Sequence, residues 1–185
     1  MADGLFYVDS RNPFIVTDPA SVTLAATDSA LIPVGSLPVL GSNYFGYVGK
    51  AVRCTMYGRI TTAVTPGNGT FDIYWGNGTS ANGTIILSSA AFALTASQTN
   101  ITWELQFIIR CRAIGTSGSV MSVGMANFNP AVVASTLQTI MLPATAPAAV
   151  TIDTTLANVI SPQFKRSGST AETMQVHEFL FESLN

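Results

Sequence analysis

The chain has 185 residues, enough for one medium-sized domain that buries its own core without disulfide staples or a structural metal. Charged residues make up only 10% of the chain, against roughly 25% in ordinary soluble domains. The net charge of −2 gives no positive field to attract phosphates, so we expect no nucleic-acid partner. The longest hydrophobic run, Ala90 to Leu94, is far shorter than the roughly 20 residues of a membrane-spanning helix, so we expect no membrane partner.

The first residues show no regular alternation of polar and apolar side chains. They contain Asn12-Pro13 and Asp18-Pro19, which favour turns or extended backbone. We predict an extended N-terminal arm over residues 1–20, laid across the body or a neighbour, followed by a single β-sandwich domain over residues 21–185. Asp3 stands where a secretory signal carries basic residues, so we expect no such signal.

Short alternating runs separated by turn residues fill the rest of the chain, and no window of helical length has a sustained apolar stripe. The predicted strands are Ser21–Ala26, Ala51–Thr61, the run around Phe71, Ile73 and Trp75, Gly83–Ser88, Ile101–Ala113, Val120–Phe128, Gln138–Leu142, Ala149–Asp153, Val159–Lys165 and Glu172–Leu184.

The clearest of these strands is Ile101–Ala113. Its odd-numbered positions are apolar and its even-numbered positions mostly polar, as a half-buried antiparallel strand requires. Gly115-Thr116-Ser117-Gly118 supplies a turn, so Val120–Phe128 is expected to return as the partner strand of a hairpin. Many strands with no helices between them predict an all-β fold, an antiparallel sandwich or barrel. A β-sandwich of the jelly-roll type is the natural choice near eight strands.

A search for reactive groups finds no nucleophile elbow, P-loop or dinucleotide motif, so we expect no enzyme, cofactor or metal site. His177 is the one histidine, and Phe181 stands where a helical zinc motif needs its second histidine. We therefore interpret His177 as a polar-face residue of the last strand. Paired carboxylates could still meet in space, although nothing in the sequence singles out a pair.

The two cysteines, Cys54 and Cys111, lie on the apolar faces of predicted strands. They are expected to be small buried hydrophobes, with a bridge between them possible if their strands face each other.

The aromatic residues divide into two groups. Trp75 and Trp103 are in register with apolar strand faces and are predicted to be core. Tyr44, Phe45 and Tyr47 lie in a Gly-rich segment, and Phe6, Tyr7 and Phe14 lie in the arm. Sugar-binding modules use such rings as stacking platforms, and protein interfaces use them as anchors. We favour the interface interpretation for all six residues.

The charges are distributed unevenly along the chain. Residues 73–103 carry none, and residues 113–164 carry only Asp153. Because the interiors of protein contacts are depleted of charged residues, this pattern favours a subunit of an assembly over a free monomer.

Three stretches are distinctive: Val48 to Thr62 (VGKAVRCTMYGRITT), Thr102-Trp103-Glu104-Leu105 with its hairpin, and Glu178 to Asn185 (EFLFESLN). They resemble virion structural proteins of tailed bacteriophages, most of all the jelly-roll decoration, or cement, proteins of the capsid. The resemblance covers residues 40–185, and it assigns no functional side chain to this sequence.

The resemblance implies a homotrimer that binds the major capsid protein on the outer surface of the virion head and strengthens the shell, after synthesis in the bacterial cytoplasm. A tail or fibre protein, or a receptor- or carbohydrate-binding virion protein on the same fold, is the alternative.

Overall fold

The computed structural model describes residues 14–76, 83–133, 139–168 and 170–185. Within them the chain forms strands and one short 3-10 helix, η1 (Val34–Ser36). The strands are β1 (Phe14–Thr17), β2 (Val22–Thr23), β3 (Ser29–Ala30), β4 (Ala51–Thr61), β5 (Asn68–Gly76), β6 (Gly83–Ser88), β7 (Phe92–Ala93), β8 (Ile101–Ala113), β9 (Gly118–Phe128), β10 (Thr139–Leu142), β11 (Ala149–Ile152), β12 (Val159–Arg166) and β13 (Thr173–Ser183).

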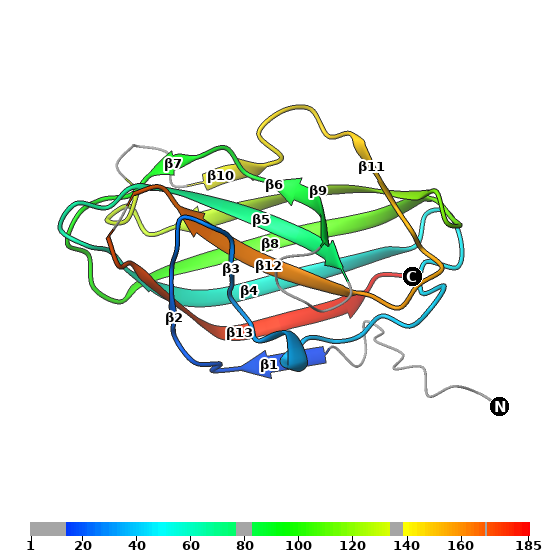
Figure 1. Ribbon diagram of the computed structural model, residues 1–185, viewed down its shortest axis with the longest axis horizontal. Coiled ribbons are helices and arrows are strands. Elements are labelled where there is room, and N and C mark those ends of the chain that lie inside the picture. Colours follow the sequence, from blue (N-terminus) through cyan, green and yellow to red (C-terminus); the bar gives the residue numbers. More distant parts are fainter. Residues whose placement is uncertain (1–13, 77–82, 134–138, 169) are drawn as a thin grey trace.

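These strands form two antiparallel sheets that pack as a sandwich (Figure 1). The large sheet has the order β1-β13-β4-β8-β9-β10, and β2 and β11 extend it by pairing with β13 and β9. The small sheet has the order β3-β12-β5-β6, with β7 also pairing with β5. The predicted all-β antiparallel sandwich is therefore confirmed.

Alternation along the strands decides which side chains enter the space between the sheets. On β8 the side chains of Trp103, Leu105, Phe107 and Ile109 are buried, while the residues between them are at least partly exposed. This is the two-residue period of a strand with one face on a core. The prediction that Trp75 and Trp103 are core residues is confirmed, since both are buried.

An aromatic cluster joins the two sheets at the centre of this core. The ring of Phe71, on β5, is fully buried and lies 4.8 Å from that of Phe164, 5.7 Å from Trp103, 5.9 Å from Phe128 and 6.3 Å from Phe92, between ring centroids. Trp103 and Phe128 belong to the large sheet and the other two to the small sheet. Phe71 therefore links the layers.

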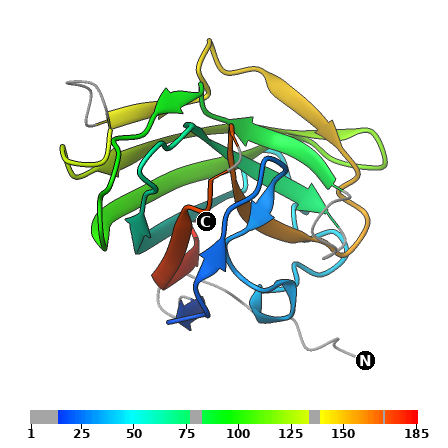
Figure 2. The ribbon, with the colours of Figure 1, turned by 60° about the vertical axis from the view of Figure 1, so that its left-hand side comes forward.

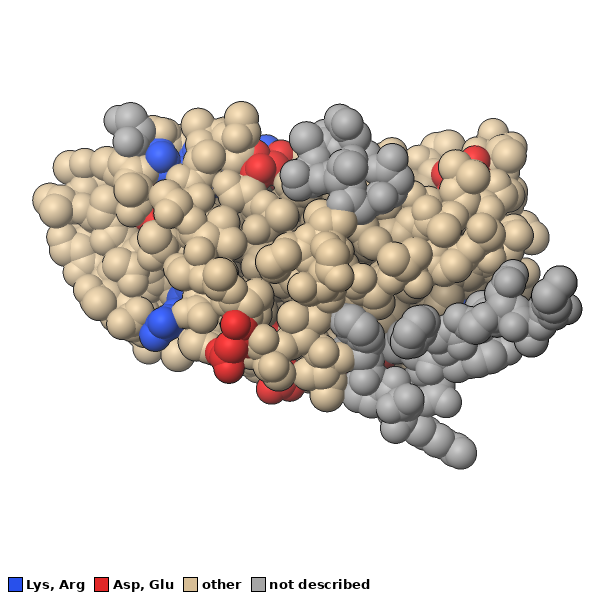
Figure 3. Space-filling model, turned by 60° about the horizontal axis from the view of Figure 1, so that its bottom comes forward, with Lys and Arg blue, Asp and Glu red and all other residues tan. Residues whose placement is uncertain are grey.

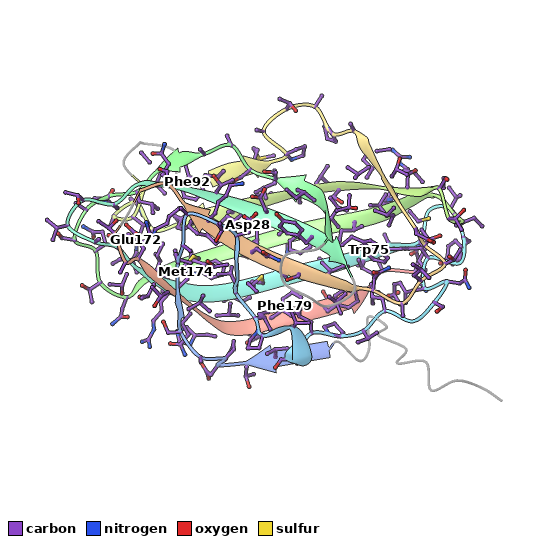
Figure 4. The ribbon with its side chains drawn as sticks, viewed as in Figure 1. Asp28, Trp75, Phe92, Glu172, Met174 and Phe179 are labelled. Atoms are coloured by element: carbon purple, nitrogen blue, oxygen red, sulfur yellow. The ribbon has the colours of Figure 1, made fainter. Side chains whose placement is uncertain are left out.

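A second aromatic group lies elsewhere in the sandwich, since Figure 4 places Phe92 and Trp75 toward opposite ends of its long axis. The ring centroid of Trp75 lies 5.6 Å from that of Phe45, which in turn packs edge-on against Tyr44. The core thus extends along most of the sandwich.

The predicted hairpin of β8 and β9 is present in the structure. Trp103 pairs with Phe128 at the open end, and Cys111 pairs with Val120 near the turn. Gly115 has a φ of +106°, in the left-handed region that favours glycine, so the turn depends on this residue.

Where the chain passes between the sheets, the predicted strand boundaries are wrong. Ser21–Ala26 is expected as one strand, but the structure has β2 in the large sheet and β3 in the small sheet. The backbone of Leu24 is bonded to Glu172 and that of Ala25 to Arg166, so neighbouring residues are held by different sheets. β7 was not predicted, since its two residues give no alternation to detect.

The described part of the arm lies on the chain's own body. Residues 14–17 form β1, an edge strand that pairs with Phe181 to Glu178 of β13. Residues 14–17 of the predicted arm are therefore part of the large sheet.

Candidate interaction surface

The outward-facing side of the large sheet is a regular surface that crosses six paired strands, and we call it the outer face. One row of outward residues crosses six strands in register: Ile15, Leu180, Thr55, Gln106, Met125 and Met141. A neighbouring row contains Glu182, Arg53, Ile108 and Val123. The face therefore carries apolar side chains at both edges of the sheet.

The exposed apolar residues concentrate on β9 and β10. Met141 is 61% exposed, Met125 lies opposite it, and Val123 is exposed in the next row. Ile15, on β1, is exposed at the other edge. Flexible methionines fit partner surfaces of many shapes, which makes this part of the face suited to protein contact.

One pair of charges on this face is neutralised within the chain. Arg53 Nε lies 2.8 Å from Glu182 Oε2, and this pairing raises the pKa of Arg53 above its usual value. A partner that covers this pair would not leave an unpaired charge away from water. Arg59 donates a hydrogen bond of 2.7 Å to the neutral amide oxygen of Gln175 and keeps its charge.

Carboxylates in and next to the small sheet also form ion pairs within the chain. Asp72 is 1% exposed, and its Oδ2 lies 2.7 Å from Lys165 Nζ. Asp28 accepts a hydrogen bond from the hydroxyl of Tyr74. Burial raises the pKa of Asp28, and the nearby Asp72 raises it further. This cluster fastens the segment before β3 to the small sheet.

Glu172 and Arg166 form a second such pair at the same end of β12, since Arg166 directly follows Lys165. Glu172 is fully buried, and its Oε2 lies 2.9 Å from Arg166 Nε. Its other carboxylate oxygen accepts a hydrogen bond of 2.6 Å from Thr170. Figure 4 shows Glu172 and Asp28 on different segments of the sandwich, so the two acids belong to separate clusters.

The six aromatic residues predicted as interface anchors differ in how far they are exposed, and two of them are not described by the structure. Phe45 is 1% exposed and Tyr44 is also buried, so both belong to the core and are not available to a partner. Tyr47 is 48% exposed. Phe14 is the first residue of β1, opposite Phe181, while Phe6 and Tyr7 lie outside the described residues.

The burial of Tyr44 and Phe45 removes the aromatic platform that a carbohydrate site at this segment would need. Instead, Lys50 Nζ lies 4.0 Å from the centroid of the Tyr44 ring, a cation–π contact at the end of the core. Burial lowers the pKa of Lys50 and raises that of Tyr44. The sequence gives no local signal for this burial, because it depends on Trp75 from another strand.

His177 lies where the sequence places it, exposed on the last strand. It occupies an irregularity in the pairing of β13 with β4, between Val176 and Glu178. Its Nδ1 lies 2.6 Å from Asp18 Oδ1, which ties the residue after β1 to β13. Among the described residues, no group of three or more His, Cys, Asp or Glu side chains could hold a metal ion.

The cysteines Cys54 and Cys111 are both free and both fully buried. Cys54 pairs across the ladder with Phe107, and Cys111 with Val120, so the two thiols do not face each other. Burial raises the pKa of both thiols. They are small buried hydrophobes, as one of the two sequence interpretations held.

The helical content of the described residues is one 3-10 turn, and no helix there has the length and hydropathy needed to cross a membrane.

No protein-family model matches the chain, and no curated protein matches it. Among solved structures, a legume lectin-like domain from Entamoeba histolytica is similar over 89% of this chain and 90% of its own, with 7% sequence identity and a TM-score of 0.27. The antiparallel sandwich itself rests on the strand pairing described above.

Proposed function

We propose that this protein is a structural subunit of a tailed-bacteriophage virion, a capsid decoration protein. In this proposal it binds as a homotrimer to the outer surface of the major capsid protein shell and stabilises the head. The resemblance of residues 40–185 to such proteins supports the proposal, and the outer face of the large sheet is the structural observation that carries it.

A decoration protein must cover capsid surface through contacts that exclude water. The outer face offers Met125, Met141 and Val123 as exposed apolar residues, with the pair Arg53–Glu182 already neutralised beside them. Interface cores are poor in unpaired charges because desolvating a charge costs several kcal/mol. The part of the outer face around Met125 and Met141 therefore suits a protein contact, while Glu178 and Glu104 lie on the same face in the row through Tyr57.

The remaining surface is also poor in charge. Figure 3 shows a side of the molecule on which acidic and basic residues are few and scattered. Part of the small number of charged residues is used internally, as Asp72 and Glu172 are almost completely buried. A protein that uses its charges in this way depends little on long-range electrostatic attraction to find its partner.

Self-association would strengthen such binding. Each subunit contributes a limited area, but a trimer that engages several capsid subunits gains avidity through effective concentration, without any new contact. The open edges of the two sheets, at β6 and β10, also favour assembly, since unpaired strand edges are usually covered or protected.

Antibody labelling of intact virions tests the proposal. Gold-labelled antibody against the purified protein is expected to decorate the head surface, and light scattering is expected to give three times the chain mass. Labelling confined to the tail would favour the tail or fibre alternative, and absence from the particle would overturn the proposal. A variant that replaces Met125 and Met141 by Lys is expected to lose head binding, because it places two unpaired charges in the contact.

A control introduces a single lysine elsewhere, to be compared with Met125→Lys and Met141→Lys made one at a time. Val64 is the most exposed of the large apolar residues and lies in the loop between β4 and β5. Val64→Lys is expected to bind heads like the unmodified protein. Equal binding by the methionine double variant and this control would show that the outer face is not the contact.

A further inference from the structure

A groove lies on the outer face where β4, β8 and β9 run side by side (Figures 1 and 2). Tyr57 of β4 pairs with Glu104 of β8, which pairs with Asn127 of β9, so their side chains form one outward row. The groove starts at this row and continues past Thr102 to Pro130. Its volume is about 370 Å³, within the range of about 300–1,000 Å³ that small-molecule sites occupy. We call it the tyrosine groove.

The aromatic surface of the tyrosine groove comes from Tyr57. This side chain is 43% exposed, although it lies on a strand with neighbours on both sides. A tyrosine in such a position presents a flat apolar ring and a polar hydroxyl to a ligand. Tyr44 and Phe45 are buried, so Tyr57 supplies the exposed ring that they do not.

The polar side chains beside the ring hold one another in place. Thr139 donates a hydrogen bond of 2.8 Å to Asn127 Oδ1, and Asn127 Nδ2 donates one of 3.4 Å to Glu104 Oε2. Asn129 Oδ1 accepts the backbone N–H of Ala131 at 3.1 Å, so the amide nitrogen of Asn129 is the part left to donate to a ligand. Side chains that are fixed before binding lose little conformational freedom when a ligand arrives.

The charges around the groove favour a neutral ligand. Among the described residues that line it, Glu104 is the one charged side chain, and Glu178 lies on the other side of Tyr57. Burial raises the pKa of Tyr57, and these two carboxylates raise it further, as a negative potential does. Arg59 pairs with Thr102 and keeps its charge, which offsets part of this potential. The negative potential disfavours an anion, and Arg59 disfavours a cation.

A saccharide has the chemistry that matches this lining. One face of a sugar ring carries C–H groups that can stack on an aromatic ring, and each hydroxyl both donates and accepts hydrogen bonds. Hydrogen bonds to a carboxylate are stronger than those between neutral groups. We propose that the tyrosine groove binds a neutral saccharide, with a ring face on Tyr57 and hydroxyls bonded to Glu104 and Asn129.

The groove extends away from the apolar patch proposed as the capsid contact. Met125 and Met141 pair in the row next to that of Tyr57, and the groove continues from Asn127 in the opposite direction, toward Pro130. A partner bound over the methionines would have the groove at its margin. The inference therefore goes beyond the proposed function and does not rest on it.

An array of neutral oligosaccharides, probed with the purified full-length chain, tests the inference. We expect the chain to bind a subset of them. Saturation-transfer NMR with a bound oligosaccharide, free in solution, is then expected to show the strongest transfer to C–H protons on one face of a sugar ring. Binding to no neutral oligosaccharide, or only to sulfated or sialylated ones, would overturn the proposal.

Two tyrosines of similar exposure give a matched pair of variants. Tyr57→Ala is expected to raise the dissociation constant of that oligosaccharide about tenfold or more, because it removes the stacking surface. Tyr57→Phe keeps the ring and is expected to change the constant less than Tyr57→Ala. Tyr47 is 48% exposed outside the groove lining, so Tyr47→Ala is expected to bind like the unmodified chain. Equal affinity of Tyr57→Ala and Tyr47→Ala would place the binding elsewhere and overturn the proposal.

The two carboxylates distinguish a saccharide from a cation as the ligand. Glu104→Ala is expected to weaken oligosaccharide binding about tenfold, since it removes a charged acceptor, and Glu178→Ala to leave it nearly unchanged, since Glu178 does not line the groove. Tetramethylammonium chloride is expected not to compete. Competition by this cation, together with equal losses in the two variants, would replace the saccharide by a cationic ligand. All the substituted side chains are at least partly exposed, and circular dichroism checks that each variant folds.

Discussion

Replacing Phe71 by Ala tests whether the aromatic cluster holds the two sheets together. Phe71 is fully buried and contacts four other rings, two in each sheet. Truncation of a buried Phe to Ala costs about 3–5 kcal/mol, and aromatic pairs add about 0.5–1.5 kcal/mol each beyond area burial. We therefore expect Phe71→Ala to lower the free energy of unfolding by about 4–5 kcal/mol, near the top of that range.

Urea denaturation followed by tryptophan fluorescence measures this loss. Trp103 lies in the cluster and Trp75 near the other end, so one signal reports on both parts of the core. Circular dichroism recorded in parallel checks that the transition has two states.

Two further variants calibrate the result. Phe71→Leu is expected to cost about 1–2 kcal/mol, because it keeps most of the volume and loses the ring contacts. Phe92→Ala is expected to cost less than Phe71→Ala, since Phe92 is 9% exposed on the short strand β7. A loss below about 2 kcal/mol for Phe71→Ala would refute the reasoning, because it falls under the range for truncating a fully packed ring.

Three other predictions concern the buried polar and thiol groups. Glu172→Ala is expected to cost about 3–5 kcal/mol in the same denaturation assay, because it leaves the Arg166 guanidinium buried without its partner, and a cost near zero would contradict a structural role for the pair. The pKa of Tyr74 is raised by burial and by Asp28, so the folded state holds the phenolic proton more tightly than the unfolded state. Stability is then expected to fall as pH rises above the ordinary pKa of 10.0, and Tyr74→Phe should make this alkaline decline shallower in thermal melts, whereas an unchanged slope would speak against it. Cys54 and Cys111 are expected to resist a thiol-reactive dye at neutral pH and to react as two thiols per chain after denaturation, and fewer than two would indicate a bridge.

The sequence alone was sufficient for the strands that carry a long alternating pattern. Ala51–Thr61, Gly83–Ser88 and Ile101–Ala113 have the predicted bounds. Alternation also assigned Trp75 and Trp103 to the core. These features are local, because the pleat of a strand sends successive side chains to opposite faces whatever the strand pairs with.

The role of the charged residues was only partly accessible from the sequence. The scarcity of charge could be read directly, but Asp72 meets Lys165 only because β5 and β12 pair, 93 residues apart in the chain. Nothing near either residue in the sequence indicates the pairing. The burial of Tyr44 and Phe45 was likewise not indicated by the neighbouring sequence. Their segment was interpreted as part of an interface, but both side chains are buried in the core.

Composition and two-residue alternation thus determined that this protein is a charge-poor antiparallel β-sandwich. Only the tertiary structure decided which strands share a sheet and which aromatic rings are buried. The physical reason is that side-chain direction follows from the local backbone, whereas strand order and layer packing depend on contacts between segments far apart in the chain, which one sequence does not encode in any local pattern.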